Sequence, residues 1–358
     1  MILSMQIIDR IRITPYQLHF RSPARTSRSV MRQRKVYFME AAGTIMNDQR
    51  IGWGEIAPLD GLSPETIEFH QSMEDLAGKW KEISAVEEFL KFPSFRFGLE
   101  AASLDLKHGG RRVWFDGEFA RGQSVIPING LIWMGDKEYM SDQIRQKLND
   151  GYPCLKLKIG GINFEEELQL LAYIRQEFSP RDLELRLDAN GSFQPEDARE
   201  KLKWLSEFSI HSIEQPVKAG QWDLMAALCA ENLIPIALDE ELIGIKTREE
   251  KERLLDHIRP QYLIFKPSLI GGLAQTREYI DFCSRRGTGW WVTSALESNV
   301  GLNVLAQFCD DLNVKRVQGL GTGKLFSNNI PSPLRESRGV VKVDPEGFWG
   351  EIMGDAEV

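Results

Sequence analysis

Charged side chains end a series of short apolar segments in the second half of the chain. In order along the sequence, these ends carry two lysines, three carboxylates and a further lysine, namely Lys156, Lys158, Asp188, Glu214, Asp239 and Lys266. The steps from position 188 to 214, to 239 and to 266 are 26, 25 and 27 residues. That spacing is typical of one strand–helix unit with short loops. We therefore expect these side chains to meet at one end of a parallel barrel.

The residue types in this series indicate acid–base chemistry beside a metal ion. Carboxylate oxygens are the ligands that Mg²⁺ prefers, so Asp188, Glu214 and Asp239 are candidate ligands. Lys156 and Lys158 are two positions apart on a strand and so face the same side. Lysines close to one another and to a dication should have lowered pKa values, and such a lysine can act as a general base. Any one of these charges could be a rim ion pair, but the whole series favours proton abstraction α to a carboxylate.

A strand–helix alternation from about residue 126 provides the elements that would position these residues. Apolar patterns predict strands at 126–131, 154–159, 183–190, 211–215, 234–239, 262–267, 290–294 and 317–320. Helical patterns lie between them, for example at 165–178, 196–208, 248–255 and 273–285. Eight strands with this period favour a closed β/α barrel, whose active site forms at the carboxyl ends of its strands. The sequence therefore predicts a catalytic barrel domain over residues 121–334.

A smaller α+β domain is predicted ahead of the barrel, over residues 1–120. Alternating apolar positions predict strands at 5–20 and 36–54, and amphipathic patterns predict helices at 65–76 and 95–108. The segment 340–352 has the pattern of a strand pair rather than of an eighth helix. We expect residues 335–358 to return to the N-terminal domain.

Composition argues against several classes of protein. A chain of 358 residues with a net charge of -8 lacks the basic excess of a nucleic-acid-binding protein. No apolar run is long enough to span a membrane, and the first residues lack the pattern of a secretory leader. The four cysteines form no CxxC pair, so we expect free thiols rather than a disulfide framework. These features predict a cytoplasmic protein that acts on a small molecule.

The strand-end motifs together resemble the muconate-lactonizing branch of the enolase superfamily. They are KLK at 156–158, DAN at 188–190, EQP at 214–216, DE at 239–240 and the lysine at 266. Three segments of the chain resemble the o-succinylbenzoate synthases of this branch. They are GWGEIAPLDGLSPET (52–66), TSALESNVGL (293–302) and GLGTGKLF (319–326). The resemblance implies an α/β fold, a (β/α)7β-type modified TIM barrel with an N-terminal α+β capping domain. It also implies Mg²⁺-dependent syn-dehydration of 2-succinyl-6-hydroxy-2,4-cyclohexadiene-1-carboxylate to o-succinylbenzoate in menaquinone biosynthesis.

The resemblance also implies a role for each candidate site residue. Lys158 would take the proton and then return it to the leaving hydroxide, Lys156 would neutralise the substrate carboxylate, and Lys266 would stabilise the anionic intermediate. The ligands of Mg²⁺, with Mn²⁺ as a substitute, would be Asp188, Glu214 and Asp239. Behind them, Glu240 would orient Lys266 or form a rim ion pair. The substrate would meet Asn190, Ser294, Gly319, Arg25 and Arg28.

The substrate contacts have simpler structural explanations beside the functional ones. Residues 19–35 are basic and form a lid over the barrel mouth in the family, where Arg25 or Arg28 would bind a dicarboxylate substrate in a fork. The same charges could belong to a solvated loop. A small residue at 294 or 319 could serve strand packing. Many relatives have serine where this chain has Glu241, and the sequence gives no account of that difference.

Two further functions stay open on the sequence. A racemase of N-acylamino acids, or a dipeptide epimerase, of the same superfamily would use Lys158 and Lys266 as bases on opposite faces, and both lysines are present. Dipeptide epimerases usually carry an acidic motif on strand eight, whereas residues 319–322 read GLGT. A non-catalytic barrel that only binds a ligand is a weaker alternative, because no lysine or carboxylate of the set is missing.

Overall fold

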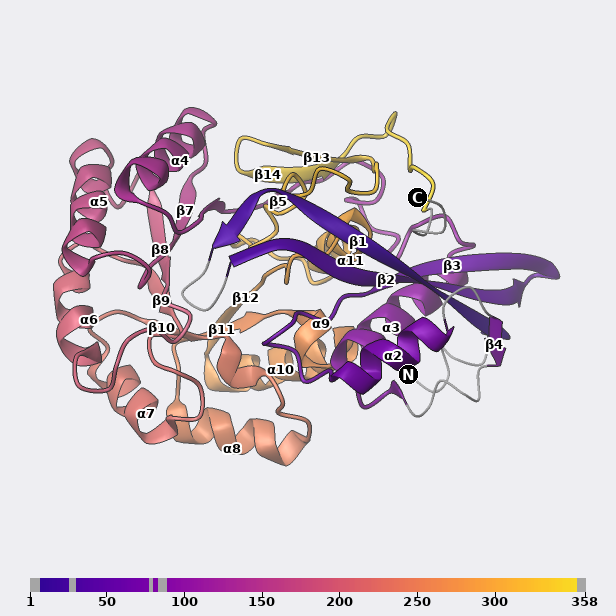
Figure 1. Cartoon of the computed structure of the whole chain (residues 1–358), viewed down its shortest axis with the longest axis horizontal. Coiled ribbons are helices and arrows are strands. Elements are labelled where there is room, and N and C mark those ends of the chain that lie inside the picture. The colour runs from indigo at the N-terminus through magenta and orange to yellow at the C-terminus, as the bar shows by residue number, and fades with distance from the viewer. Residues whose placement is uncertain (1–6, 26–29, 77–79, 83–88, 353–358) are drawn as a thin grey trace.

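The computed structural model describes residues 7–25, 30–76, 80–82 and 89–352. An antiparallel sheet with two helices lies beside a curled parallel sheet that is surrounded by helices (Figure 1). The predicted barrel with an N-terminal α+β unit is therefore confirmed as a fold class. None of the helices in the described ranges is long and apolar enough to cross a membrane.

The antiparallel sheet has the strand order β3-β2-β1-β4. Its strands are β1 (Arg10–Arg25), β2 (Val30–Ile45), β3 (Asp48–Ile56) and β4 (Trp80–Glu82). The helices α2 (Ile67–Leu76) and α3 (Pro93–Lys107) accompany it. Glycines allow α3 to lie directly on β3, since a Cβ atom at Gly54 would come within 2.0 Å of the Gly98 carbonyl oxygen. This close packing excludes any larger residue at position 54.

Two predictions for this region need correction. The single strand predicted at 36–54 is wrong, because Met46 and Asn47 have φ values of 49° and 69° and turn the chain between β2 and β3. Residues 19–35, predicted to form a lid, lie largely in β1 and β2, which pair as far as Arg25 and Val30. The Arg28 prediction falls outside the described residues.

The parallel sheet has seven strands in the order β12-β11-β10-β9-β8-β7-β6. They are β6 (Gly130–Ile132), β7 (Cys154–Lys158), β8 (Glu184–Asp188), β9 (Ser212–Glu214), β10 (Ile236–Leu238), β11 (Tyr262–Phe265) and β12 (Gly289–Val292). The eighth strand predicted at 317–320 is only a pair of bridges, from Gln318 to Ile128 and from Gly319 to Thr293. The Gln318 side chain accepts a hydrogen bond from the Val292 N–H at 2.7 Å. A side chain thus replaces part of the ladder where the barrel closes.

The helices that follow the strands cover the outside of the barrel (Figure 1). They are α4 (Lys137–Asn149), α5 (Phe164–Glu177), α6 (Ala198–Ser206), α7 (Trp222–Glu231), α8 (Arg248–Ile258), α10 (Gly272–Arg286) and α11 (Asn299–Asp311), with the short α9 (Pro267–Ile270) after β11. Polar caps begin several of them, such as the capping box of Thr247 and Glu250 at α8. Their apolar faces join the main hydrophobic core with the strands.

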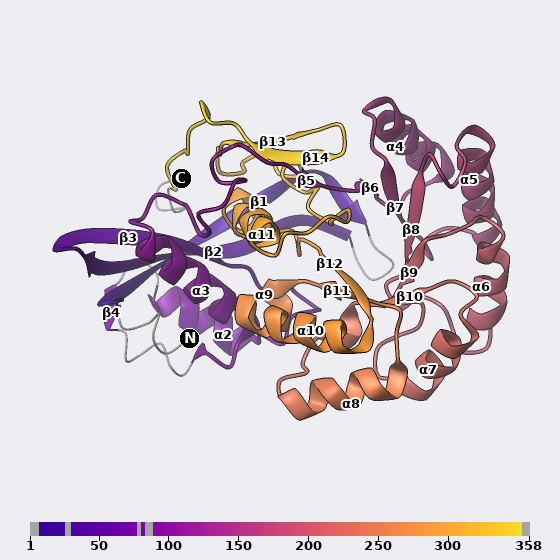
Figure 2. The ribbon, with the colours of Figure 1, turned by 180° about the vertical axis from the view of Figure 1, so that it is seen from behind.

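The two sheets are joined by helices and by the C-terminal segment. Figures 1 and 2 both show α3 beside α9 and α10. The hairpin β13 (Leu334–Ser337) and β14 (Val340–Val343) pairs with β5 (Ile126–Pro127), so the strand predicted at 126–131 is split between β5 and β6. Beyond the hairpin, Trp349 packs edge-on against Trp114 with ring centroids 6.0 Å apart. The domain boundaries at 120 and 334 stay predictions.

Candidate active site

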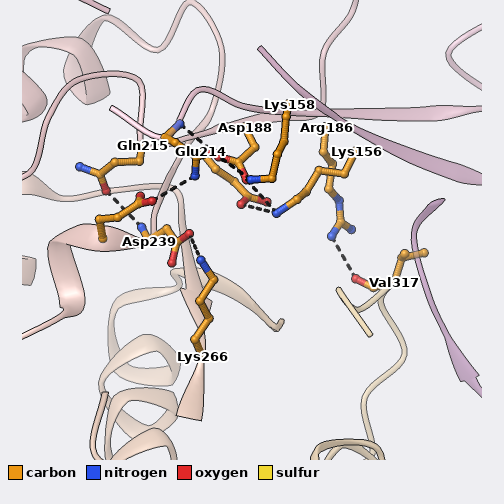
Figure 3. A network of polar contacts seen from close by, with 11 residues as sticks. Lys156, Lys158, Arg186, Asp188, Glu214, Gln215, Asp239, Lys266 and Val317 are labelled. Carbon is orange, nitrogen blue, oxygen red and sulfur yellow. Dashed lines mark hydrogen bonds and ion pairs between the residues drawn. The ribbon is translucent and has the colours of Figure 1, made fainter. Parts of the chain in front are cut away.

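The six charged residues lie together at the carboxyl ends of five neighbouring strands (Figure 3). Strand register places Lys158 opposite Asp188, and Asp188 opposite Glu214. Asp239 and Lys266 follow β10 and β11 directly. All six side chains are buried, with residue exposures between 0% and 9%. Parallel strands that end at one level therefore gather them, as the spacing in the sequence predicted.

Each carboxylate of the group meets a lysine. The Lys156 Nζ lies 2.7 Å from Glu214 Oε2 and 3.2 Å from Asp188 Oδ2. The Lys158 Nζ donates to Asp188 Oδ2 and to Asn190 Oδ1, both at 2.8 Å. Lys266 forms an ion pair with Asp239. The site is a compact set of alternating charges rather than a cluster of one sign.

The three lysines do not share one electrostatic environment. Burial lowers the pKa of Lys158, and the nearby positive charges of Lys156 and Lys266 add to this effect against the opposing Asp188. Burial also acts to lower the pKa of Lys156, but Glu214 and Asp188 raise it above its usual range. For Lys266, Asp239 and Glu240 likewise outweigh burial and raise the pKa. The expected lowering of the pKa is found for Lys158, whereas the protein's own carboxylates raise the pKa of Lys156 and Lys266, because Lys156 meets Glu214 and Asp188 and Lys266 meets Asp239 and Glu240. The pKa of these lysines beside a bound dication stays a prediction.

The carboxylates differ in the same way. Burial raises the pKa of Glu214 to about 7, and the neighbouring charges of Asp188 and Asp239 support the shift. Burial also raises the pKa of Asp239, which Lys266 opposes. Burial acts in the same direction on Asp188, but Lys158, Lys156 and Lys266 hold its pKa far below the usual range. A cation that joined these groups would relieve the repulsion among the three carboxylates.

The donor set fits a hard divalent cation. Asp188, Glu214 and Asp239 supply carboxylate oxygens from adjacent strand ends, and the buried Glu214 Oε1 has no hydrogen-bond partner. Among the described residues, no three carboxylate, histidine or cysteine side chains already stand in ligating geometry. The lysine ammonium groups instead occupy one oxygen of each carboxylate.

A cavity opens directly above the charged group, and several predicted substrate contacts line it. Its wall includes Asn190, Ser294 and Gly319 together with Lys156, Lys158, Asp188 and Lys266. The Ser294 hydroxyl donates to Glu297 Oε2 at 2.6 Å. A Cβ atom at Gly319 would come within 2.4 Å of Thr293 Oγ1, so strand packing already requires a glycine there.

Two further predicted site residues, Glu240 behind the metal ligands and Arg25 at the substrate, are not part of the cavity wall. Glu240 Oε1 accepts a hydrogen bond from Asn190 Nδ2 at 3.0 Å, behind the cavity. Arg25 is exposed at the end of β1 and is not part of the cavity wall, whereas Met31 of β2 is. The structure therefore brings β2 to the cavity but does not include Arg25 in its wall.

Sequence reasoning missed several residues of the wall. The N-terminal unit contributes Leu59, Asp60 and Leu62, and the barrel contributes Asn129 and Trp133. Trp133 directly follows β6, so the same strand-end argument that found the lysines could have found it. No comparable signal marks Leu59 to Leu62, because their place depends on how the two sheets pack.

Comparison with known families matches both parts of the chain. The family described as "Enolase C-terminal domain-like" matches residues 139–346. The family described as "MenC, N-terminal domain" matches residues 9–106. The chain is 43% identical to an o-succinylbenzoate synthase of Desulfotalea psychrophila, over 91% of this chain and 96% of the relative. It is 30% identical to one of Pasteurella multocida, over 81% and 83%.

Solved structures agree with these matches. The crystal structure of MenC from Desulfotalea psychrophila superposes with a TM-score of 0.79 at 40% identity, over 94% of this chain and all of that chain (100%). A substrate-liganded L-Ala-D/L-Glu epimerase from Bacillus subtilis superposes with a TM-score of 0.74, over 96% of this chain and 98% of that one. The identity to the epimerase is only 18%, so that likeness shows the fold alone.

Proposed function

The chain belongs to the o-succinylbenzoate synthase family of the enolase superfamily, and from this we propose the reaction that its site performs. It is a carbon–oxygen lyase that dehydrates 2-succinyl-6-hydroxy-2,4-cyclohexadiene-1-carboxylate to o-succinylbenzoate, a step of menaquinone biosynthesis. The observation that carries the proposal is the lysine–carboxylate group at the strand ends of a chain 43% identical to such a synthase. The free and buried cysteines fit the cytoplasm as the place of action.

Asp188, Glu214 and Asp239 would hold Mg²⁺, for which Mn²⁺ could substitute. Their carboxylate oxygens are of the type that Mg²⁺ prefers, and the unpartnered Glu214 Oε1 supports this assignment. When bound, the ion stabilises the negative charge that develops on the substrate carboxylate as the neighbouring proton leaves. In the same site, Lys156 compensates charge close to Asp188 and Glu214.

Lys158 would transfer the proton in both directions. As a neutral amine, its Nζ takes the ring proton next to the substrate carboxylate, and the electrons of that C–H bond spread as negative charge over the ring carbon and the carboxylate. They form the new ring double bond as the bond between the neighbouring ring carbon and its hydroxyl group breaks. The hydroxyl group then leaves from the same face with the proton that Lys158 returns, so that water is released. One base is enough, because loss of water makes the ring aromatic. The hydrogen bond from Lys158 Nζ to Asn190 Oδ1 supports this role by aiming the amine.

Lys266 would remain a cation across the cavity and stabilise the negative charge of the intermediate. Its ion pair with Asp239 favours the protonated form. Asn190, Ser294 and Gly319 would shape the wall against the ring and its carboxylate. Arg25 and Arg28 would bind the second carboxylate of this small dicarboxylate substrate.

A direct assay tests the proposal. The purified chain should convert the cyclohexadiene acid to o-succinylbenzoate, with activity lost in EDTA and restored by Mg²⁺. Asp239→Asn should bind Mg²⁺ much more weakly in calorimetry and show little turnover at the same metal concentration. If the unmodified enzyme stays fully active in EDTA, the assignment of the three carboxylates as metal ligands is wrong.

A further inference from the structure

Glu241 follows the proposed metal ligand Asp239 and its neighbour Glu240 in the sequence, but it is not part of the cavity wall. It is buried, with 4% of its surface exposed. Its two carboxylate oxygens bind two donors of the loop after β9. Oε1 accepts from the Gly220 N–H at 2.8 Å, and Oε2 accepts from Gln215 Nε2 at 3.0 Å. Glu241 thus connects the end of β10 to the end of β9.

Gln215 completes the connection from the other side. Its Oε1 accepts from the N–H groups of Asp239 at 3.2 Å and Glu241 at 3.3 Å. Its Nε2 also donates to the Val217 carbonyl at 3.1 Å. Figure 3 shows Gln215 next to Asp239, one residue after Glu214. All four hydrogen-bonding sites of this buried amide are therefore used.

The backbone at Gln215 needs this support. Its φ is 39°, in the left-handed region that non-glycine residues rarely adopt. Such a conformation costs free energy and persists only where the surroundings fix it. The side-chain amide, held at both ends, provides that fixation. Since Gln215 directly follows Glu214, the same contacts fix the backbone from which the Glu214 side chain projects.

A carboxylate at position 241 is the group that fits both donors. A carboxylate only accepts hydrogen bonds, and both partners, the Gly220 N–H and the Gln215 amide NH₂, only donate. A glutamine in its place would have to turn its own NH₂ towards one of these donors. One of the two hydrogen bonds would then be lost in a buried position, and the amide of Gln215 would lose its fixed orientation.

We infer that Glu241 is a positioning residue for the metal site: through Gln215 it fixes the end of β9, with Glu214, relative to the end of β10, with Asp239. The inference rests on the proposed metal role of these two carboxylates. Glu241 itself is not part of the cavity wall. Glu241 fixes the two strand ends before an ion binds. Carboxylates on fixed strand ends lose less conformational freedom when they ligate an ion, so the affinity for the ion is higher.

Metal affinity of the full chain tests the inference. Glu241→Gln should weaken Mg²⁺ and Mn²⁺ binding about 10- to 100-fold in calorimetry, the range typical of residues that orient metal ligands. The matched control is Asp105→Asn. Asp105 is also a buried carboxylate that bridges two backbone donors, Trp53 N–H at 2.9 Å and Val113 N–H at 3.1 Å, but in the N-terminal unit. The control should keep the affinity of the unmodified chain.

A second variant breaks the same connection from the other end. Gln215→Asn tolerates the left-handed backbone but is one methylene too short to reach Glu241. It should reproduce the loss of affinity, and the double variant should bind no more weakly than the weaker single variant, since both remove one connection. If Glu241→Gln fails to fold, Gln215→Asn alone decides.

Two results would overturn the inference while leaving the metal assignment intact. The first is that the folded single variants bind the metal as tightly as the unmodified chain does. The second is that the losses of metal affinity in the two single variants add up in the double variant. A different result would overturn both the inference and the proposed metal site. It is that the unmodified chain binds no divalent ion, or that Asp239→Asn binds the ion as tightly as the unmodified chain does.

Discussion

Lys158 and Lys266 differ in what they touch, although both are buried lysines at the mouth of the barrel. Lys158 shares Asp188 with Lys156 and donates its second hydrogen bond to a neutral amide, whereas Lys266 faces the charge of Asp239. This asymmetry fits one proton-transferring base and one fixed cation. Strand-end spacing was enough to predict that these side chains meet, because barrel geometry gathers strand ends. It could not predict their charge states, which depend on the carboxylate that each ammonium meets.

Lys158→Ala should lower kcat for dehydration by about 10²- to 10⁴-fold, the usual contribution of a positioned general base. Mg²⁺ affinity should not fall, because the change removes a positive charge beside Asp188. Steady-state kinetics and calorimetry on the same preparation measure both. Lys218→Ala, at an exposed lysine of the loop after β9, is the control and should retain full activity. Equal activities in the two variants would exclude Lys158 as the base.

Arg25→Ala should raise KM for the dicarboxylate substrate more than it lowers kcat. Loss of a charge-assisted hydrogen bond costs about 1.5–3 kcal/mol, which corresponds to roughly a 10- to 100-fold rise. The same result is expected for Arg28→Ala. Arg50→Ala serves as the control, since Arg50 is an exposed arginine at the other end of the sheet that pairs with Asp48. A KM that is unchanged in both the Arg25 and the Arg28 variant would mean that neither arginine binds the substrate.

At the scale of secondary-structure elements, Glu55 of β3 docks the start of α11. Its oxygens accept from the Ser298 N–H at 2.8 Å, the Ser298 hydroxyl at 2.5 Å and the Gly301 N–H at 2.8 Å. The side chain is fully buried. Burial raises the pKa of Glu55 to about 6, and the charge of nearby Glu297 adds to the shift while these hydrogen bonds oppose it. No sequence pattern marks this contact, because it joins positions 243 residues apart.

The docking should make stability depend on pH. The folded-state pKa of Glu55, about 6, lies above the ordinary value of 4.5, so the folded state binds the extra proton between these values. The contribution of Glu55 to the free energy of unfolding should therefore fall by about 2 kcal/mol as the pH rises from 4.5 to above 6. Glu55→Gln has no such titration. Urea unfolding at pH 4.5 and pH 7 gives the free energy of unfolding of the unmodified protein and of Glu55→Gln. The unmodified protein should lose about 2 kcal/mol relative to the variant between these two pH values. A difference between the two proteins that does not change with pH would contradict this role of Glu55.

At the scale of the whole molecule, Arg34 joins the two halves around the cavity. This buried side chain of β2 donates to the carbonyl oxygens of Ala57 at 2.6 Å and Pro58 at 3.3 Å, and to that of Ala295 beyond β12. The acceptors adjoin Leu59 of the N-terminal unit and Leu296 of the barrel, and both of these leucines line the cavity. The sequence marked Arg34 only as one basic residue of a lid. Its role could not be predicted, because it arises where the N-terminal unit packs on the barrel.

Arg34→Lys should therefore weaken the contacts between the N-terminal unit and the barrel while keeping the positive charge. A lysine ammonium cannot reach three carbonyl groups in the fork geometry of a guanidinium. We expect a loss of about 1–3 kcal/mol in the free energy of unfolding. We also expect a higher KM, because the N-terminal unit and the barrel, which both line the cavity, would be held together less firmly. Chemical unfolding and steady-state kinetics provide the two values. Arg12→Lys, at a partly exposed ion pair with Glu40, is the control and should change neither.

The most direct test of the central claim compares two reactions of the unmodified enzyme. The chain is incubated with Mg²⁺ and either the cyclohexadiene acid or a panel of N-acylamino acids in D₂O, and dehydration, racemisation and deuterium incorporation are followed. The account predicts fast formation of o-succinylbenzoate, and any slow exchange into N-acylamino acids should come from the face of Lys158. Fast racemisation of an N-acylamino acid without dehydration of the cyclohexadiene acid would contradict it.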